Sequence, residues 1–269
     1  IRFITVAIGW FSTYDESIGY FNSPGIEAVA IIFMVVCGIN FGLHFYAFKG
    51  GVKNYLADDE TRTYLLILSV AAVITSISLI IFGRYDALDA LRGSIFTVVS
   101  IFTTTGFTTE DFTQWPNMLP YMIFFGAFSG ACAGSTGGGM KIIRVLLIWK
   151  QGIREVFRII HPNAMFPVKV NHRPVSPGVI EAIWGFFSVY VLIFVALHLI
   201  MIGLGMDFLT AFSAVGACLN NLGPGLGDVA YHYGDISDQA KIVLVVAMML
   251  GRLEIFTLLV LFTFMFWRK

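Results

Sequence analysis

Long apolar stretches without charge decide what this chain can fold into. Residues 64–82 contain no charged residue, and residues 178–204 form a longer run interrupted only by Glu181. At about 1.5 Å per residue, a helix of either length can cross the roughly 30 Å hydrocarbon core of a bilayer. The chain is 57% hydrophobic and 13% charged, whereas soluble domains are about 45–50% apolar and about 25% charged. Helix-length runs without strand-like alternation predict an all-α polytopic membrane protein.

Further helices and connections are expected before, between and after these two runs. Two more membrane spans are predicted at 26–48 and 241–267, and a helix starting at 117–132 breaks and resumes at Met140 up to about residue 160. Shorter apolar segments at 1–9, 93–102 and 207–219 are too short to cross a bilayer as helices. A polar connection is expected at 49–63, and a proline-rich loop at 161–177.

The order of these segments indicates a repeat. A long helix, a short helix, a loop and a long helix follow one another at 64–160 and again at 178–267, and the second half of this unit occurs at 1–48. Trp10, Gly106 and Gly223 fall at matching places in the three loops. Each is followed five residues later by an aspartate: Asp15, Asp111 and Asp228. Repeats with irregular segments at corresponding positions point to a transport path.

The loop after the short helix at 93–102 is rich in hydroxyl groups. Residues 103–109 contain five threonines and one glycine, and two acids follow. Such a segment suits a re-entrant pore loop, because irregular backbone at membrane depth is tolerated where it lines a water-filled path, and its carbonyls can replace the hydration shell of an alkali cation. The alternative is an ordinary threonine-rich turn between two helices.

A glycine-rich break interrupts the helix that starts at 117–132. Its sequence is Ala133-Gly134-Ser135-Thr136-Gly137-Gly138-Gly139. A phosphate-binding loop is excluded because Lys141 does not follow the last glycine directly, Ile142 replaces the required Ser or Thr, and no strand precedes the break. A mobile loop in the membrane and a packing kink between helices both remain open.

Arg252 lies about eleven residues into the apolar run 241–267. A charged residue at such depth is costly and marks a functional site by default. Glu254 is two positions away and does not share its helix face, so the alternative role is a structural ion pair with another helix. The three cysteines and five histidines show no metal-binding spacing, and no cofactor is predicted.

The distribution of charge predicts the orientation. The formal net charge is zero, which gives no electrostatic case for nucleic-acid binding. Segments 11–23, 107–119 and 224–239 contain acids but no Lys or Arg, whereas 49–62, 141–173 and 268–269 carry most of the basic residues. By the positive-inside rule, the acidic loops face outward and the basic segments face the cytoplasm. The acids would also concentrate cations at the outer mouth.

Four motifs together resemble the Trk/Ktr/HKT superfamily of potassium transporters, most closely its bacterial TrkH branch. They are TTTGFTTEDF at 103–112, AGSTGGGMK at 133–141, ACLNNLGPGLG at 217–227 and MLGRLE at 249–254. The resemblance implies repeated helix–pore-loop–helix units around one pore, as in potassium channels. Residues 1–50 would be the end of a second repeat, 51–173 a third and 174–269 a fourth. Because the chain begins inside an element, an N-terminal part is expected to precede it.

The resemblance also implies an ion filter and a gate. The filter would be lined by Ile8–Gly9–Trp10, Thr104–Thr105–Gly106 and Asn221–Leu222–Gly223, with K⁺ held at Thr104, Thr105, Asn221 and Leu222. The family pattern expects glycine where Trp10 stands, and a one-residue offset would use Gly9 instead. The gate would be the intramembrane loop Gly134, Ser135, Thr136, Gly137, Gly138 and Gly139, acting together with Arg252.

The expected function is therefore uptake of K⁺ across the bacterial inner membrane, with conduction of Na⁺ as well left open. The resemblance implies a homodimer that binds a TrkA-like cytosolic nucleotide-binding regulatory subunit. A non-conducting fragment and an intramembrane enzyme are the alternatives. The enzyme is disfavoured because the sequence places no Ser/His, paired-Asp or His/Glu metal constellation at membrane depth.

Overall fold

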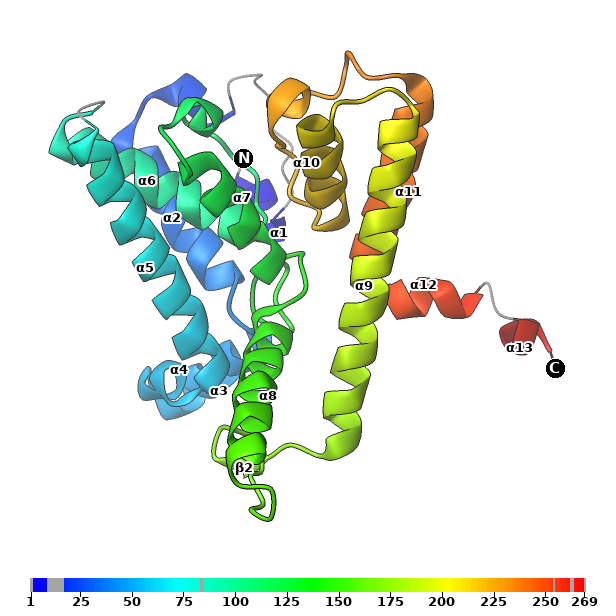
Figure 1. The fold of residues 1–269 in the computed structure, drawn as a ribbon. Coiled ribbons are helices and arrows are strands. Elements are labelled where there is room, and N and C mark those ends of the chain that lie inside the picture. Colours follow the sequence, from blue (N-terminus) through cyan, green and yellow to red (C-terminus); the bar gives the residue numbers. More distant parts are fainter. Residues whose placement is uncertain (1, 9–16, 83–84, 254, 262–263, 269) are drawn as a thin grey trace.

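Long helices carry short helices and loops between them in the computed structural model (Figure 1). The structure describes residues 2–8, 17–82, 85–253, 255–261 and 264–268. The short helices α6, α7 and α10 lie in the upper half of Figure 1, and α3, α4 and the β1–β2 hairpin lie at the opposite end. The predicted all-α architecture is confirmed, because the described elements are helical apart from one two-stranded hairpin.

Among the residues that the structure describes, two helices are each long and apolar enough to cross a membrane: α5 (Asp59–Ile81) and α9 (Pro177–Gly203). Asp58 caps α5 by accepting a hydrogen bond from the amide of Thr61 at 2.9 Å. Many apolar side chains on both helices are exposed, such as Leu66 and Leu192. A helix that is hydrophobic on all sides suits contact with lipid rather than water.

The predicted span 26–48 is wrong as a single helix. The segment forms α2 (Pro24–Cys37) and α3 (Phe41–Gly50), which meet at an angle of 95°. Gly38 ends α2, and the side chain of Asn40 caps α3 by accepting from the amide of Gly42 at 2.8 Å. A side chain at Gly38 would place its Cβ 2.2 Å from the hydroxyl of Tyr64, so the bend also fits the close approach of α5.

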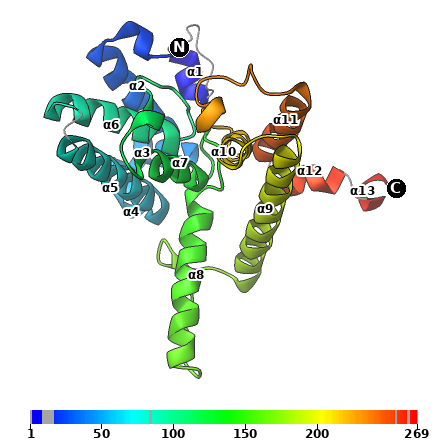
Figure 2. The same ribbon diagram turned by 45° about the horizontal axis from the view of Figure 1, so that its top comes forward.

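The predicted span 241–267 is also wrong as a single helix. It forms α11 (Asp238–Arg252), α12 (Ile255–Leu261) and α13 (Phe264–Trp267), and α12 leaves α11 sideways (Figures 1 and 2). The rings of Phe186 in α9 and Phe256 in α12 lie 6.0 Å apart between centroids. The turn after Arg252 therefore places apolar residues of α12 against α9 rather than prolonging α11.

The short helices precede the predicted pore loops. They are α1 (Arg2–Ala7), α6 (Ala87–Phe102) and α10 (Phe208–Leu219). α6 starts six residues before its predicted beginning, and α10 is buried along most of its length between α9 and α11. Asp207 caps α10 by accepting from the amides of Leu209 and Thr210. The remaining elements are η1 (Gly19–Phe21), α4 (Lys53–Ala57), η2 (Phe112–Gln114), α7 (Leu119–Ser129), α8 (Ile142–Ile160), β1 (Lys169–Val170), β2 (Arg173–Pro174) and η3 (Gly227–Val229).

The two predicted units each have a hydrophobic core, and aromatic rings join them. One core lies among α5, α6 and α7, and the other among α9, α10 and α11. The ring of Phe128 at the end of α7 lies 5.7 Å from Phe194 of α9 and 6.5 Å from Phe212 of α10. This contact brings the glycine-rich break after α7 next to the loop after α10. The predicted repeat boundaries stay a prediction.

Candidate functional site

The loop after α6 begins with three fully buried threonines, Thr103, Thr104 and Thr105. Thr104 and Gly106 have φ values of 60° and 76°, in the left-handed region that costs a non-glycine residue energy. The amides of Thr105 and Gly106 both donate to the carbonyl of Ser100, at 2.8 and 3.2 Å. The hydroxyls of Thr103 and Thr105 lie 2.7 Å apart. The amides of this loop are thus bonded back to the end of α6.

The loop after α10 has the same geometry. Asn221 and Gly223 have φ values of 55° and 99°. The amide of Leu222 donates to the carbonyl of Ala217 at 2.8 Å, over the same five-residue interval as Thr105 and Ser100. The two loops that the sequence aligned therefore share backbone conformation and hydrogen bonding.

The first loop repeats part of this pattern at Ile8. Ile8, Thr104 and Asn221 each lie two residues before a sequence-aligned position, and Ile8 also has a positive φ of 49°. The amide of each bonds to the carbonyl three residues earlier, at 3.3, 3.0 and 3.1 Å. A β-branched residue with positive φ is a genuine outlier. Gly9 and Trp10, predicted in the filter, lie outside the described residues, so their role stays a prediction.

Carbonyl groups remain free in the second and third loops. Within the described part of the chain, no hydrogen bond ends on the carbonyls of residues 103–105 or 220–222. Thr103, Thr104 and Thr105 are 0% exposed, and Leu222 is equally buried. Buried carbonyls normally have partners, because an unmade hydrogen bond costs about 1–3 kcal/mol. A dehydrated cation is a partner that satisfies several such oxygens at once.

The glycine loop, defined as residues 133–139, lies against the second and third pore loops and against the end of α1. The amide of Gly138 donates to the hydroxyl of Thr104 at 2.6 Å. A Cβ on Gly138 would lie 2.1 Å from the carbonyl oxygen of Asn220. The hydroxyl of Thr136 donates to the carbonyl of Val6 at 3.1 Å. Segments that are far apart in the sequence therefore meet at one point beneath the loops.

The conformation of the glycine loop explains its composition. Gly134 and Gly139 have φ values of 71° and 75°. A Cβ on Gly137 would lie 2.5 Å from the Cβ of Ala131 and 3.1 Å from the carbonyl oxygen of Thr103. The ammonium of Lys141 donates to the carbonyl of Gly137. Side chains at these positions would hold the loop away from the pore loops.

Arg252 lies beside the glycine loop. Arg252 is the last residue of α11, and it is exposed. The sequence predicts that it lies deep within one continuous span, and that prediction is wrong. Nη1 of Arg252 donates to the carbonyl of Thr136 at 3.2 Å. Among the residues that the structure describes, no carboxylate lies within ion-pair distance of Arg252. A cavity of about 440 Å³ lies at this place, and its lining includes Lys141, Arg144, Arg252 and residues 134–139.

Two tyrosines that no sequence motif marks support the third pore loop. The hydroxyl of Tyr190 donates to Oδ1 of Asn220 at 2.8 Å, and the hydroxyl of Tyr233 donates to the carbonyl of Gly223 at 2.7 Å. Both tyrosines sit in apolar or loop segments and carry no motif. Their hydrogen bonds hold the third pore loop in place, and these contacts are visible only in the folded chain.

A second cavity of about 440 Å³ lies on the other side of the pore loops. Its lining includes Thr109, Glu110, Asp111, Tyr231 and His232. Burial opposes ionisation of Asp111, but hydrogen bonds from Thr113, Tyr231 and Gln114 outweigh it and hold the pKa of Asp111 below its usual range. Asp111 is therefore ionised at neutral pH, and negative charge lines the approach to the loops.

Comparison with known proteins agrees with this arrangement. Residues 4–269 match the family described as TrkH, cation transport protein. The chain is 52% identical over 268 residues to the Trk system potassium uptake protein TrkH of Halomonas elongata, covering 99% of this chain and 56% of that protein. It is 47% identical over 269 residues to the protein of the same name from Escherichia coli K12, with the same coverage.

A solved structure has the same fold. The crystal structure of the potassium transporter TrkH from Vibrio parahaemolyticus superposes with a TM-score of 0.94 and 50% sequence identity, over 99% of this chain and 58% of that chain. The chain thus spans little more than half the length of the relatives it matches. With a family match over nearly all of its residues, the chain belongs to the TrkH family of cation transport proteins.

Proposed function

We propose that this chain forms part of a potassium uptake pathway in a bacterial inner membrane. The observation that carries the proposal is the pair of matching left-handed loops whose buried carbonyls have no donor within the described residues. The relatives with 47–52% identity are named as potassium uptake proteins. Uptake would follow the electrochemical gradient, and Na⁺ is a second ion to be tested beside K⁺. Transport rather than catalysis is the proposed activity.

The filter is proposed at Thr104, Thr105 and Gly106 in the second loop and at Asn221, Leu222 and Gly223 in the third. Carbonyls at Thr104, Thr105, Asn221 and Leu222 would replace the hydration shell of K⁺. Ile8, Gly9 and Trp10 are proposed for the first loop, supported by the shared conformation at Ile8. Backbone carbonyl oxygens would coordinate the ion, so no cofactor is proposed.

The glycine loop with Arg252 is proposed as the gate. The loop lies directly beneath Thr104 and Asn220, where it would obstruct an ion that leaves the filter. Arg252 places a fixed positive charge next to Thr136. Coulomb repulsion between unit charges grows as the dielectric falls, so a positive charge beside a narrow path opposes a cation.

Assembly is proposed from the resemblance and the charge distribution. The protein would act as a homodimer in the lipid bilayer and bind a cytosolic nucleotide-binding regulatory subunit. The basic segment 141–173 would face that subunit. α8 supports this proposal, because Lys150, Arg154 and Arg158 lie on its part remote from the pore loops.

Replacing Gly106 with Ser tests the filter. Gly106 has a φ of 76°, so a side chain strains the backbone next to the proposed ion ligands and should reduce the preference for K⁺ over Na⁺. Gly205→Ser is the matched control, because Gly205 has a φ of 92° with no atom within 4 Å of an added Cβ. Uptake of both ions is measured in vesicles. An unchanged K⁺/Na⁺ ratio in Gly106→Ser would reject this loop as the filter.

A further inference from the structure

A buried carboxylate lies beside the glycine loop without belonging to it. Glu60 is the second residue of α5 and is 7% exposed. In the sequence it stands in a polar connection, just before the uncharged run 64–82, where an acid reads as an ordinary helix-start residue. Its burial argues against an ordinary surface role, because a glutamate is almost never buried unless it is paired.

One oxygen of Glu60 binds the first residue of the glycine loop and the first turn of α8. Its Oε1 accepts from the amide of Ala133 at 2.6 Å and from the amide of Ile143 at 3.2 Å. Ile143 lies in the first turn of α8, whose amides have no partner within the helix. Lys141 at the cap position gives no side-chain cap to α8. A carboxylate from α5 supplies it instead, where the helix dipole also favours negative charge.

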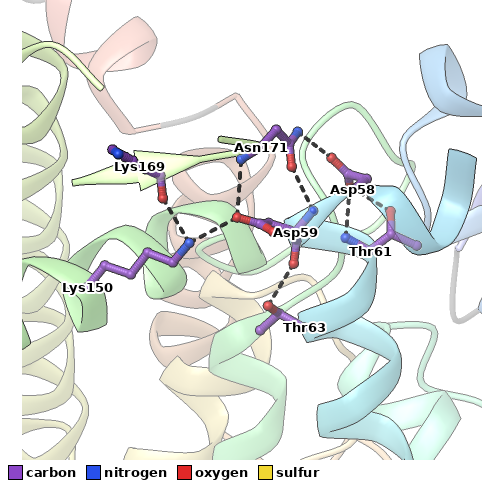
Figure 3. Close-up of polar contacts among 7 residues, drawn as sticks. All are labelled: Asp58, Asp59, Thr61, Thr63, Lys150, Lys169 and Asn171. Atoms are coloured by element: carbon purple, nitrogen blue, oxygen red, sulfur yellow. Dashed lines mark hydrogen bonds and ion pairs between the residues drawn. The ribbon is translucent and has the colours of Figure 1, made fainter. Parts of the chain in front are cut away.

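The residues before Glu60 fix the start of α5 in place (Figure 3). Lys150 of α8 forms an ion pair with Asp59 at 3.0 Å. Asn171, between the strands of the hairpin, donates its amide to Asp59 at 3.1 Å and its side-chain nitrogen to Asp58 at 2.7 Å. Oδ1 of Asn171 also accepts from the amide of Asp59 at 2.7 Å. The backbone that carries Glu60 is therefore tied to α8 and to the hairpin.

The glycine loop has a second attachment that does not involve Glu60. The amide of Cys132 donates to the carbonyl of Gly38 at 2.9 Å, and the amide of Phe41 donates to the carbonyl of Gly134 at 3.1 Å. These bonds join the loop to the bend between α2 and α3. Without the carboxylate, these bonds would remain, while the amides of Ala133 and Ile143 would lose their acceptor.

We propose that Glu60 is a positioning residue that holds the glycine loop beneath the pore loops by binding the amides of Ala133 and Ile143. The expected effect of Glu60 on ion flux rests on the proposed gating function, whereas its effect on the position of the loop does not. Glu60 itself touches no ion. Its removal leaves these two amides without their acceptor, so the loop spends less time docked on Thr104.

The test uses Glu60→Ala and Glu60→Gln, with Glu181→Ala as the matched control, because Glu181 is exposed near the start of α9. Loop position is read from the rate at which a thiol reagent labels Ser135→Cys, since the native cysteines Cys37, Cys132 and Cys218 are buried. The same protein without Ser135→Cys gives the background. Basal K⁺ uptake into vesicles is measured in parallel.

The expected results are graded. A hydrogen bond to a charged group changes an equilibrium by about tenfold or more, so Glu60→Ala should raise labelling and basal uptake by at least that factor. Glu60→Gln keeps an acceptor of the same shape without the charge and should fall between Glu60→Ala and wild type. A packing role alone predicts that Glu60→Gln behaves as wild type, and that result overturns the proposal.

Two further measurements keep the outcome decisive. If Glu60→Ala does not fold, hydrogen exchange of the peptide 131–143 in Glu60→Gln replaces it, and unchanged protection there contradicts the proposal. Deletion of residues 137–139 tests the gate independently of Glu60. If that deletion leaves uptake unchanged while Glu60 variants still alter labelling, the gate is rejected and the positioning role of Glu60 stands.

Discussion

The contact between Gly138 and the third pore loop can be tested by adding one methyl group. In Gly138→Ala, the new Cβ would lie 2.1 Å from the carbonyl oxygen of Asn220 and 3.2 Å from the hydroxyl oxygen of Thr104. Ordinary van der Waals contact starts near 3.4 Å, so the two segments must separate by 3.4 − 2.1 = 1.3 Å. The obstructing atom belongs to the backbone and cannot turn away as a flexible side chain would.

The cost of this overlap gives the expected magnitude. Overpacking by a methyl group costs about 1–3 kcal/mol, and separation also breaks the 2.6 Å bond from Gly138 to Thr104, worth about 1 kcal/mol. Destabilising the docked loop by about 2–4 kcal/mol shifts its docking equilibrium by a factor of about 30 to 1000. Because the proposed gate is closed when docked, basal K⁺ uptake should rise.

Gly152→Ala serves as the control for this experiment. Gly152 lies in α8, beyond the loop, and an added Cβ there meets no atom within 4 Å. Alanine in an exposed helix stabilises by about 1 kcal/mol relative to glycine, so uptake should stay at the wild-type level. K⁺ uptake and melting temperature are measured for both variants. Reduced uptake in Gly138→Ala, with Gly152→Ala normal, would mean that the methyl group blocks the path, which refutes the gating argument.

Three other predictions concern charge and orientation. Arg252→Ala should raise basal cation uptake, and a variant that loses thermal stability without any gain in uptake would reject Arg252 as part of the gate. Arg92 holds the buried Glu27 with two bonds of 2.6 Å, so Arg92→Met should destabilise the protein by about 1–3 kcal/mol; melting temperatures equal to wild type would contradict this. A cysteine at Thr113 should react with an impermeant reagent from outside and one at Asn163 should not, and the reverse pattern would overturn the orientation.

The regular parts of the fold follow closely from the sequence. The uncharged run 64–82 becomes most of α5, and the predicted span 178–204 differs from α9 by one residue at each end. Hydropathy over a helix-length window is a strong signal, because every backbone group in lipid must be satisfied within the segment. Gly106 and Gly223 could be aligned from the sequence because both positions have a positive φ, which restricts the residue type to glycine more than elsewhere.

The bends escaped prediction because they are decided by tertiary contacts. Residues 26–48 are apolar throughout their middle, and nothing in their hydropathy marks Gly38. Its role is visible only next to Tyr64 of α5 and next to the amide of Cys132, which bonds to its carbonyl. Likewise, the turn after Arg252 depends on α9 as a surface for Phe256. Periodicity within one segment carries no information about a partner that is distant in the chain.

The way in which the glycine loop docks suits a gate that opens reversibly. The amide of Gly138 binds the hydroxyl of Thr104, and within the described residues the carbonyls of the second and third pore loops remain without donors. In the proposed gate, the loop would therefore obstruct the exit without occupying the proposed ion ligands. Leaving the docked position breaks one neutral hydrogen bond to the second pore loop, worth about 1 kcal/mol, rather than a ring of them. A barrier built from close glycine packing and a nearby positive charge can then be shifted by modest differences in binding energy between the two positions of the loop.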